Sequence, residues 1–124
     1  MSAADSGVLA PPAVLIAVPT YRRQDDLRRL LLALEPVVAH ATDSGAAVRV
    51  DVLVIDNDAD GSALAVVDGR IDGVSAVHEA TPGVAAARNR ALDESGDHDV
   101  LVFIDDDESP AGIDWLTRLL ETAR

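Results

Sequence analysis

The sequence contains neither cysteine nor lysine, and aromatic residues make up only 2% of its 124 positions. The lack of cysteine excludes a disulfide framework and a thiolate metal site. The lack of lysine excludes a P-loop lysine, a Schiff-base lysine and the lysine of a phospho-acceptor receiver domain. Because hydrophobic residues still make up 48% of the chain, Val, Leu, Ile and Ala must build the core of one small globular domain.

Positive charge is also scarce, and the net charge is −12. Nucleic acids and anionic membrane surfaces attract basic patches, so we expect neither as the main partner. A nucleotide remains compatible with this charge, because a divalent cation can bridge clustered carboxylates to phosphates. The three histidines, His40, His78 and His98, lie far apart in the sequence and lack metal-ligand spacing.

The N-terminus has no basic start, and Pro11 and Pro12 interrupt its apolar stretch, which argues against a signal peptide. No run approaches the roughly 18 apolar residues of a membrane span. We therefore interpret residues 1–12 as a flexible leader and residues 13–124 as the folded domain. We expect a cytoplasmic protein with no evident membrane association.

Four short apolar runs predict β-strands. Each is bounded by turn residues, as expected of strands that are buried on both faces of a sheet. The predicted strands span residues 14–18, 50–55, 74–78 and 100–104.

Helical patterns separate these strands. The leucines between positions 27 and 34 recur on one helix face, and Pro36 predicts the end of this helix near Glu35, with a loop over residues 39–47. Further helices are predicted at residues 63–67 after a Ser62 cap, at residues 84–92 after the Thr81-Pro82-Gly83 turn, and around Ile113, Leu116, Leu119 and Leu120.

The alternation of strands and helices predicts an α/β fold with a parallel sheet and helices on both faces. Ligands of such sheets bind outside the carboxyl ends of the strands. Here polar residues directly follow three strands, at positions 19–22, 56–58 and 105–107. We therefore expect these segments, distant in sequence, to meet at one edge of the sheet.

Asp105, Asp106 and Asp107 form the sharpest feature of this edge. Unit charges about 4 Å apart repel one another by about 1 kcal/mol even in water. A hard cation such as Mg²⁺ or Mn²⁺, bound together with phosphate and water oxygens, would relieve that repulsion. The alternative is a solvated turn whose acidic residues cap the following helix.

Three other candidate residues each allow two interpretations. Arg88 can hold a phosphate, a ribose or a base carbonyl, or pair with an acidic neighbour on an exposed helix face. Tyr21 can stack on a nucleobase or pack against Pro19. Asp56 can accept a base N–H or simply terminate a strand.

Four segments, taken in order, resemble a known family: VLIAVPTYRR, VLVIDNDADGSA, TPGVAAARNRALDES, and VLVFIDDDESP followed by IDWLTRLLE. They are similar to the N-terminal, donor-binding half of family 2 glycosyltransferases. That family has a PTYNR-like turn, a VDDGSxD-like turn, a GxxxARN helix start and a DxD-type cluster before a W-L pair. The order and spacing agree across about residues 14–120. The resemblance implies an incomplete GT-A, Rossmann-like domain.

The resemblance also implies roles for residues after the first two strands. Pro19, Thr20 and Tyr21 would line the pocket for the nucleotide base, with Arg22 as a further substrate-binding residue. Asp56 would match the aspartate that contacts the base.

The later segments would contribute the phosphate and metal contacts. Arg88 would match the arginine near the base and diphosphate. Asp105 and Asp107 would match the cluster that binds ribose and the divalent metal, Mn²⁺ or Mg²⁺, with Asp106 in the ribose contact. One departure is that Asn57-Asp58 replaces the more usual Asp-Gly.

By this resemblance the protein would transfer a sugar from a nucleoside diphosphate sugar, with the UDP type favoured, to an unknown acceptor. In the family, the acceptor site and the general base come from residues that follow the donor half. We therefore expect no general base in this chain, little or no activity of the chain alone, and possible self-association.

A non-catalytic nucleotide- or metal-binding α/β module, such as a receiver-like domain, is the alternative. A receiver requires an acidic pair after the first strand and a late lysine. A haloacid-dehalogenase-like phosphatase requires a nucleophilic aspartate where Pro19-Thr20-Tyr21 stands. A Rossmann oxidoreductase requires a G-x-G-x-x-G turn, which the sequence lacks.

Overall fold

The computed structural model describes residues 10–67 and 73–122, so the predicted leader lies almost wholly outside the described residues. Strands and helices alternate along the chain, as the sequence predicts. The elements are β1 (Ala13–Thr20), α1 (Gln24–Asp43), β2 (Arg49–Asp56), α2 (Leu64–Val67), β3 (Val74–His78), α3 (Val84–Glu94), β4 (Val100–Phe103) and α4 (Trp115–Thr122).

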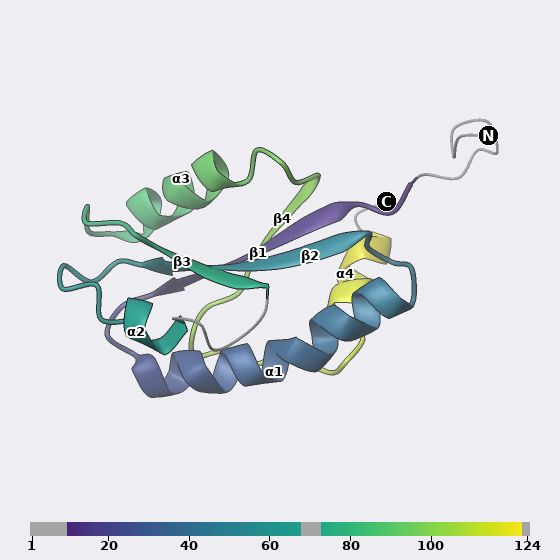
Figure 1. Ribbon diagram of the computed structural model, residues 1–124, viewed down its shortest axis with the longest axis horizontal. Helices are drawn as coiled ribbons and strands as arrows, with labels where there is room; N and C mark the ends of the chain where they lie inside the picture. Colours follow the sequence, from purple (N-terminus) through teal and green to yellow (C-terminus); the bar gives the residue numbers. More distant parts are fainter. Residues whose placement is uncertain (1–9, 68–72, 123–124) are drawn as a thin grey trace.

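The four strands form one sheet in the order β3-β2-β1-β4, and every neighbouring pair is parallel. Helix α3 covers one face, whereas α1, α2 and α4 lie on the other (Figure 1). The prediction of a parallel α/β sheet with helices on both faces is therefore confirmed. Among the described residues, no helix is long and apolar enough to cross a membrane.

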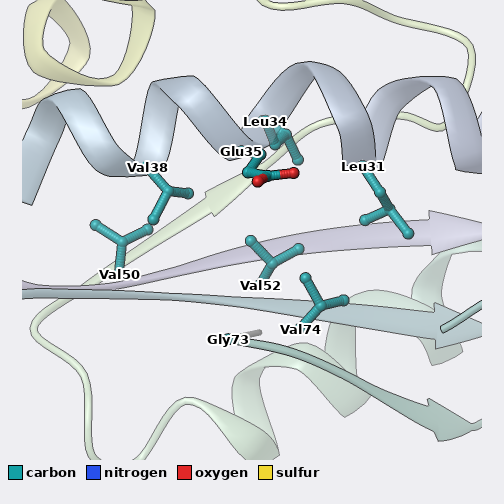
Figure 2. A pocket seen from close by; sticks show the side chains of 8 residues that line it. All are labelled: Leu31, Leu34, Glu35, Val38, Val50, Val52, Gly73 and Val74. Carbon is teal, nitrogen blue, oxygen red and sulfur yellow. The ribbon is translucent and has the colours of Figure 1, made fainter. Parts of the chain in front are cut away.

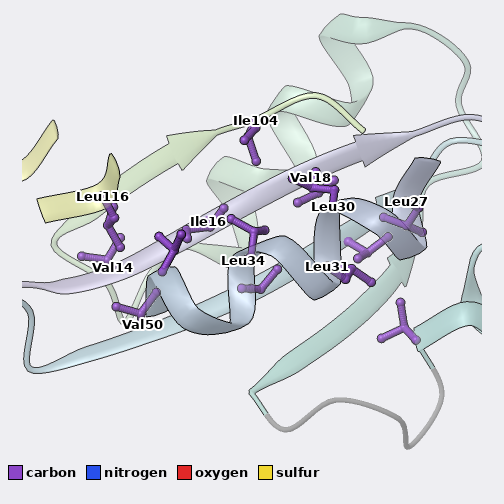
Figure 3. Packing of buried hydrophobic residues seen from close by; sticks show 14 of the residues in the cluster. Val14, Ile16, Val18, Leu27, Leu30, Leu31, Leu34, Val50, Ile104 and Leu116 are labelled. Atoms are coloured by element: carbon purple, nitrogen blue, oxygen red, sulfur yellow. The ribbon is translucent and has the colours of Figure 1, made fainter. Parts of the chain in front are cut away.

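Strand β1 shows why the apolar runs do not alternate with polar residues. Val14, Ile16 and Val18 point to the α1 side, where they join the larger core cluster, and Leu15 and Ala17 join the smaller cluster under α3. Successive side chains of a strand point to opposite faces, so a strand that is covered on both sides needs apolar residues throughout. Figure 3 shows the larger cluster, in which leucines of α1 pack onto β1.

Helix α1 does not end near Glu35, so that prediction is wrong. Pro36 lies inside the helix, which continues to Asp43 and replaces the first half of the predicted loop. A proline in a helix interior costs about 3 kcal/mol through the lost hydrogen bond and a steric clash. Here Pro36 lies on the exposed side, while the following turns bury Val37 and Ala41. Burial of Val37 and Ala41, which follow Pro36 by one and five positions, offsets the free-energy cost of the proline.

Two other helix starts differ from prediction. Helix α4 begins at Trp115, so Ile113 precedes it and is 55% exposed, while Leu116 and Leu120 are buried. Helix α2 begins at Leu64, and the Ser62 hydroxyl donates to the Asp58 carboxylate at 2.6 Å. A hydrogen bond to a charged acceptor is stronger than one between neutral groups, which explains why the hydroxyl is held by the carboxylate.

Replacement of Leu34 by alanine is expected to destabilise the fold strongly. Leu34 is 1% exposed in the larger core cluster, and a Leu→Ala change in such a site costs about 2–5 kcal/mol. Leu32 on the same helix is 58% exposed, so Leu32→Ala is the matched control and should change stability by roughly 0.5 kcal/mol or less. Urea unfolding measures both. Equal losses for the two variants would contradict the placement of α1.

Candidate functional site

The carboxyl ends of β1, β2 and β4 meet at one edge of the sheet, as predicted. Thr20, the last residue of β1, lies opposite Asp56, the last residue of β2, and Ala17 of β1 lies opposite Phe103 at the end of β4. An open pocket of about 350 Å³ lies at this edge. Its lining residues are Pro19, Thr20, Tyr21, Arg23, Asn57, Val84, Ala87, Asp105, Asp106 and Asp107.

The predicted site residues divide into two groups. Those after β1 and β4 line the pocket, apart from Arg22. Arg22, Asp56 and Arg88 do not line it. Four lining residues were not predicted as site residues: Arg23, Asn57, Val84 and Ala87. Arg23 and Asn57 each directly follow a predicted residue in the sequence, and that adjacency is the signal that could have found them.

The three consecutive aspartates have different environments. Asp106 is buried, and its Oδ2 accepts a hydrogen bond from Thr20 Oγ1 at 2.8 Å. Burial raises the pKa of Asp106, and the Thr20 hydroxyl and the Arg23 charge partly oppose that rise. Asp105 and Asp107 are exposed. The middle carboxylate therefore joins the segment after β4 to the end of β1, and the outer two remain accessible to a ligand.

The outer carboxylates fit a hard cation only with help from a ligand. The described residues contain no group of three or more His, Cys, Asp or Glu side chains that could hold a metal ion. Mg²⁺ commonly binds one or two carboxylates together with substrate phosphates and water. Asp105 and Asp107 match that donor set, so they would hold a cation together with a bound diphosphate.

Arg23 supplies positive charge to the same carboxylates. Its Nη1 atom lies 3.5 Å from Asp106 Oδ1 and 3.2 Å from Asp107 Oδ2. We call this pair of contacts the Arg23 bridge. The Arg23 bridge relieves part of the repulsion among the three aspartates. The sequence alone did not identify this counter-charge.

The neighbouring Arg22 is held away from the pocket. Its φ of 54° is the single positive value among the described non-glycine residues. Its Nε donates to Asp58 Oδ1 at 3.1 Å, and its Nη2 lies 3.4 Å from Asp60 Oδ2. The guanidinium also lies 5.5 Å from the centre of the Tyr21 ring, close enough for a cation–π contact. Tyr21 is 56% exposed, so its ring remains accessible at the pocket wall.

Asp56 is fully buried and organises the loop that follows β2. One oxygen accepts the Asp58 N–H at 2.9 Å, and the other accepts the Ala63 N–H at 2.7 Å. The carboxylate therefore satisfies two backbone donors of the turn. A base contact through Asp56 stays a prediction, and it would have to share these oxygens with the backbone.

Asn57 connects the end of β2 to the segment before α3. Its Nδ2 donates to the carbonyl oxygens of Glu79 and Thr81 at 3.0 and 2.7 Å. Its Oδ1 accepts the Gly83 N–H at 3.0 Å. An aspartate would lack the donor that makes the first two bonds. Asn57, which departs from the more usual Asp-Gly pattern of this turn, thus holds the start of α3 beside the pocket.

Arg88 lies on the exposed side of α3, where its guanidinium is 5.4 Å from the centre of the Phe103 ring. That distance permits a cation–π contact with the end of β4. The side chain is thus near the correct sheet edge without lining the pocket. A phosphate or base contact through Arg88 stays a prediction.

A second pocket, of about 70 Å³, lies between α1 and the β2–β3 side of the sheet (Figure 2). Among the described residues, Glu35 is its single charged lining residue, and the other lining residues are apolar or glycine. Such a surface offers little to a phosphate or a cation. The pocket at the strand ends is therefore the better candidate for a functional site.

Comparison with known proteins identifies the family of the chain. The family model described as Glycosyl transferase family 2 matches residues 15–124. The chain belongs to glycosyltransferase family 2. It is also 43% identical over 113 residues to the succinoglycan biosynthesis protein ExoM of Rhizobium meliloti (strain 1021), covering 88% of this chain and 34% of ExoM. No solved structure gives a significant match.

Family membership explains the shape of the sheet. A four-stranded parallel sheet with helices on both faces is consistent with part of a GT-A, Rossmann-like domain. The chain spans about a third of the length of the curated relative, 34%. The family 2 assignment also agrees with the first strand, which ends in Pro19-Thr20 without the acidic pair of a receiver.

Asp58 makes the stability of this family 2 domain depend on pH. The Ser62 hydroxyl, the Asp60 N–H and the Arg22 guanidinium all donate to its carboxylate, and the Ser62 bond makes the largest contribution to lowering its pKa from 3.8 to about 2. A carboxylate with a lowered pKa contributes stability above its unfolded-state value, and that contribution is lost as the pH falls through the folded-state value.

Asp58→Asn is therefore expected to be less stable than the unaltered protein at pH 5–7, and the difference should shrink as the pH falls from 3.8 through about 2. Urea unfolding between pH 2 and 7 measures the difference. Asp43→Asn, at the exposed end of α1, is the control and should show no such pH-dependent loss. A constant difference across the whole range would refute the role of the charge.

Proposed function

We propose that this chain is the donor-binding part of an enzyme that transfers a sugar from a nucleoside diphosphate sugar to an acceptor. The observation that carries the proposal is the pocket at the strand ends. It combines an exposed aromatic ring, Tyr21, with two exposed carboxylates, Asp105 and Asp107, in one lining. A nucleobase needs a flat apolar surface and a diphosphate needs a cation, so the two halves of the ligand match the two parts of the pocket.

The apolar part of the pocket suits the nucleoside. Pro19, Tyr21, Val84 and Ala87 supply carbon surface from the end of β1, the turn after it and α3. Tyr21 and Val84 are 56% and 69% exposed, so apolar contact with a base would shield them from water. The Asn57 side-chain amide bonds to Thr81 and Gly83 before α3, and its backbone N–H donates to the Thr20 carbonyl oxygen at the end of β1 at 2.9 Å. These contacts fix the separation of the two elements. The UDP type is favoured by the family resemblance.

The acidic part of the pocket suits the diphosphate. A divalent cation bound by Asp105 and Asp107 would stabilise the negative charge on the departing diphosphate. Thr20 holds the buried Asp106, and this bond fixes the backbone from which the two flanking carboxylates extend. A cation would therefore meet carboxylates on a well-supported backbone.

The acceptor and the general base have no assigned residue in the described structure. ExoM extends well beyond the matched region, since the alignment covers 34% of its length. We propose that the acceptor site and the general base lie in sequence that corresponds to the unmatched part of ExoM. An inverting transfer would need a carboxylate there to remove the proton from the acceptor hydroxyl.

Metal-dependent nucleotide binding tests the proposal. Isothermal calorimetry should detect UDP binding to the chain with Mn²⁺ present and much weaker binding with EDTA. Asp107→Ala should weaken the Mn²⁺-dependent affinity by roughly tenfold or more, because it removes one of two protein ligands. Asp43→Ala, at the exposed end of α1, should leave it unchanged.

The same titration with GDP and ADP tests the preference for the UDP type. Competition against bound UDP should rank UDP first. Equal affinities would remove the base preference and leave the diphosphate site intact. Absence of any metal-dependent nucleotide affinity would contradict the donor-binding role itself.

We also propose that the chain self-associates. Large apolar side chains are exposed on several elements, including Leu32 at 58%, Val48 at 67% and Leu92 at 59%. Strands β3 and β4 each have one neighbour in the described sheet, so each presents an edge for pairing. Light scattering over a tenfold concentration range should show a mass that rises with concentration. A constant monomer mass would contradict self-association.

A further inference from the structure

Arg23 occupies the acidic part of the pocket in a way that the donor-binding role does not require. The Arg23 bridge joins one buried carboxylate, Asp106, to one accessible carboxylate, Asp107, at 3.5 and 3.2 Å. The side chain is 52% exposed, and Arg23 lines the pocket together with the aspartates. A positive group thus already lies beside Asp107 Oδ2, one of the oxygens that a divalent cation would use.

The backbone of Arg23 is fixed although its side chain is not enclosed. Arg23 is the N-cap residue of α1, and its carbonyl oxygen accepts the Leu27 N–H at 2.8 Å. Leu27 is fully buried in the core. The guanidinium therefore extends from a rigid anchor beside the pocket on a long side chain, and rotation about that side chain can move it off Asp107 without unfolding the helix.

We propose that Arg23 is a resident counter-cation, which the metal must displace from Asp107 and which then pairs with the diphosphate. This inference rests on the proposed donor-binding function. A metal ion that arrives alone must break the Arg23–Asp107 contact without compensation. A metal ion that arrives with a diphosphate brings phosphate oxygens, which a guanidinium binds well. Arg23 thereby makes the binding of metal and nucleotide cooperative.

The electrostatic balance favours this sequence of events. Asp106 stays covered by Thr20 and cannot turn outward without losing a buried hydrogen bond. Asp107 is 56% exposed and has no such constraint among the described contacts. The contact with Asp107, the carboxylate assigned to the metal, is the shorter of the two, but both of its partners are half-exposed. Because an exposed ion pair contributes little, this is the half of the Arg23 bridge that opens at the lower cost.

Mn²⁺ binding to the full chain, followed by electron paramagnetic resonance of the free ion, tests the inference without any measurement of catalysis. Arg23→Gln should bind Mn²⁺ alone roughly three- to tenfold more tightly than the unaltered chain, as expected when one half-exposed ion-pair partner is removed. The ratio of Mn²⁺ affinities with and without UDP should fall by a similar factor, because UDP no longer gains Arg23 as a partner.

Arg28→Gln is the matched control. It removes the same charge from the same helix, and Arg28 pairs with Asp25 at 3.2 Å, away from the aspartate triplet. Its Mn²⁺ affinity should equal that of the unaltered chain. Arg23→Lys keeps the charge but not the planar fork, and it should lie between the unaltered chain and Arg23→Gln. Circular dichroism checks that each variant folds. If Arg23→Gln does not fold, the Mn²⁺ affinity of Arg23→Lys tests the inference in its place.

The outcomes separate this inference from the proposed function. Equal Mn²⁺ affinity and equal coupling in Arg23→Gln and the unaltered chain would overturn the counter-cation role and leave donor binding intact. Failure of Mn²⁺ to bind any of these proteins, with or without UDP, would overturn both. Tighter Mn²⁺ binding in Arg28→Gln as well would show a general effect of charge and would also reject a specific role for Arg23.

Discussion

Parallel pairing of β1 with β2 on one side and with β4 on the other is the constraint on which the site depends. Parallel strands must end at the same edge of a sheet, so the residues after them meet even though long stretches of chain separate them. Thr20 and Asp106 show the result, since a hydrogen bond of 2.8 Å joins residues 86 positions apart. An antiparallel β4 would have carried the acidic triplet to the opposite edge.

Charge is distributed around the pocket so that most of the carboxylates are already engaged. Asp56 and Asp58 hold the loop after β2 through backbone amides, a hydroxyl and Arg22. Asp106 holds the end of β1. Only the flanking Asp105 and Asp107 face outward among the three consecutive aspartates. The pocket can thus present a small, specific anionic surface, because the buried carboxylates beside it serve the fold.

The two arginines of the first turn show how local backbone geometry selects between neighbouring side chains. Arg22 and Arg23 are chemically identical, yet Arg22 adopts a left-handed φ of 54° and turns to the loop after β2. Arg23 begins α1 and reaches the triplet after β4. The positive φ costs energy in a residue with a Cβ atom, and two ion pairs and the Tyr21 ring compensate for it.

The apolar runs and the leucine spacing were sufficient to predict the parallel sheet, its two covered faces and the edge at which polar residues gather, because burial on both faces requires continuous apolar strands. Sequence motifs likewise indicated the family. Only the tertiary structure decided that Pro36 stays inside a helix, that Asp56 is buried and that Arg23 rather than Arg22 reaches the triplet. These outcomes depend on long-range packing and on hydrogen-bond partners up to 86 positions away, which no local pattern of residues encodes.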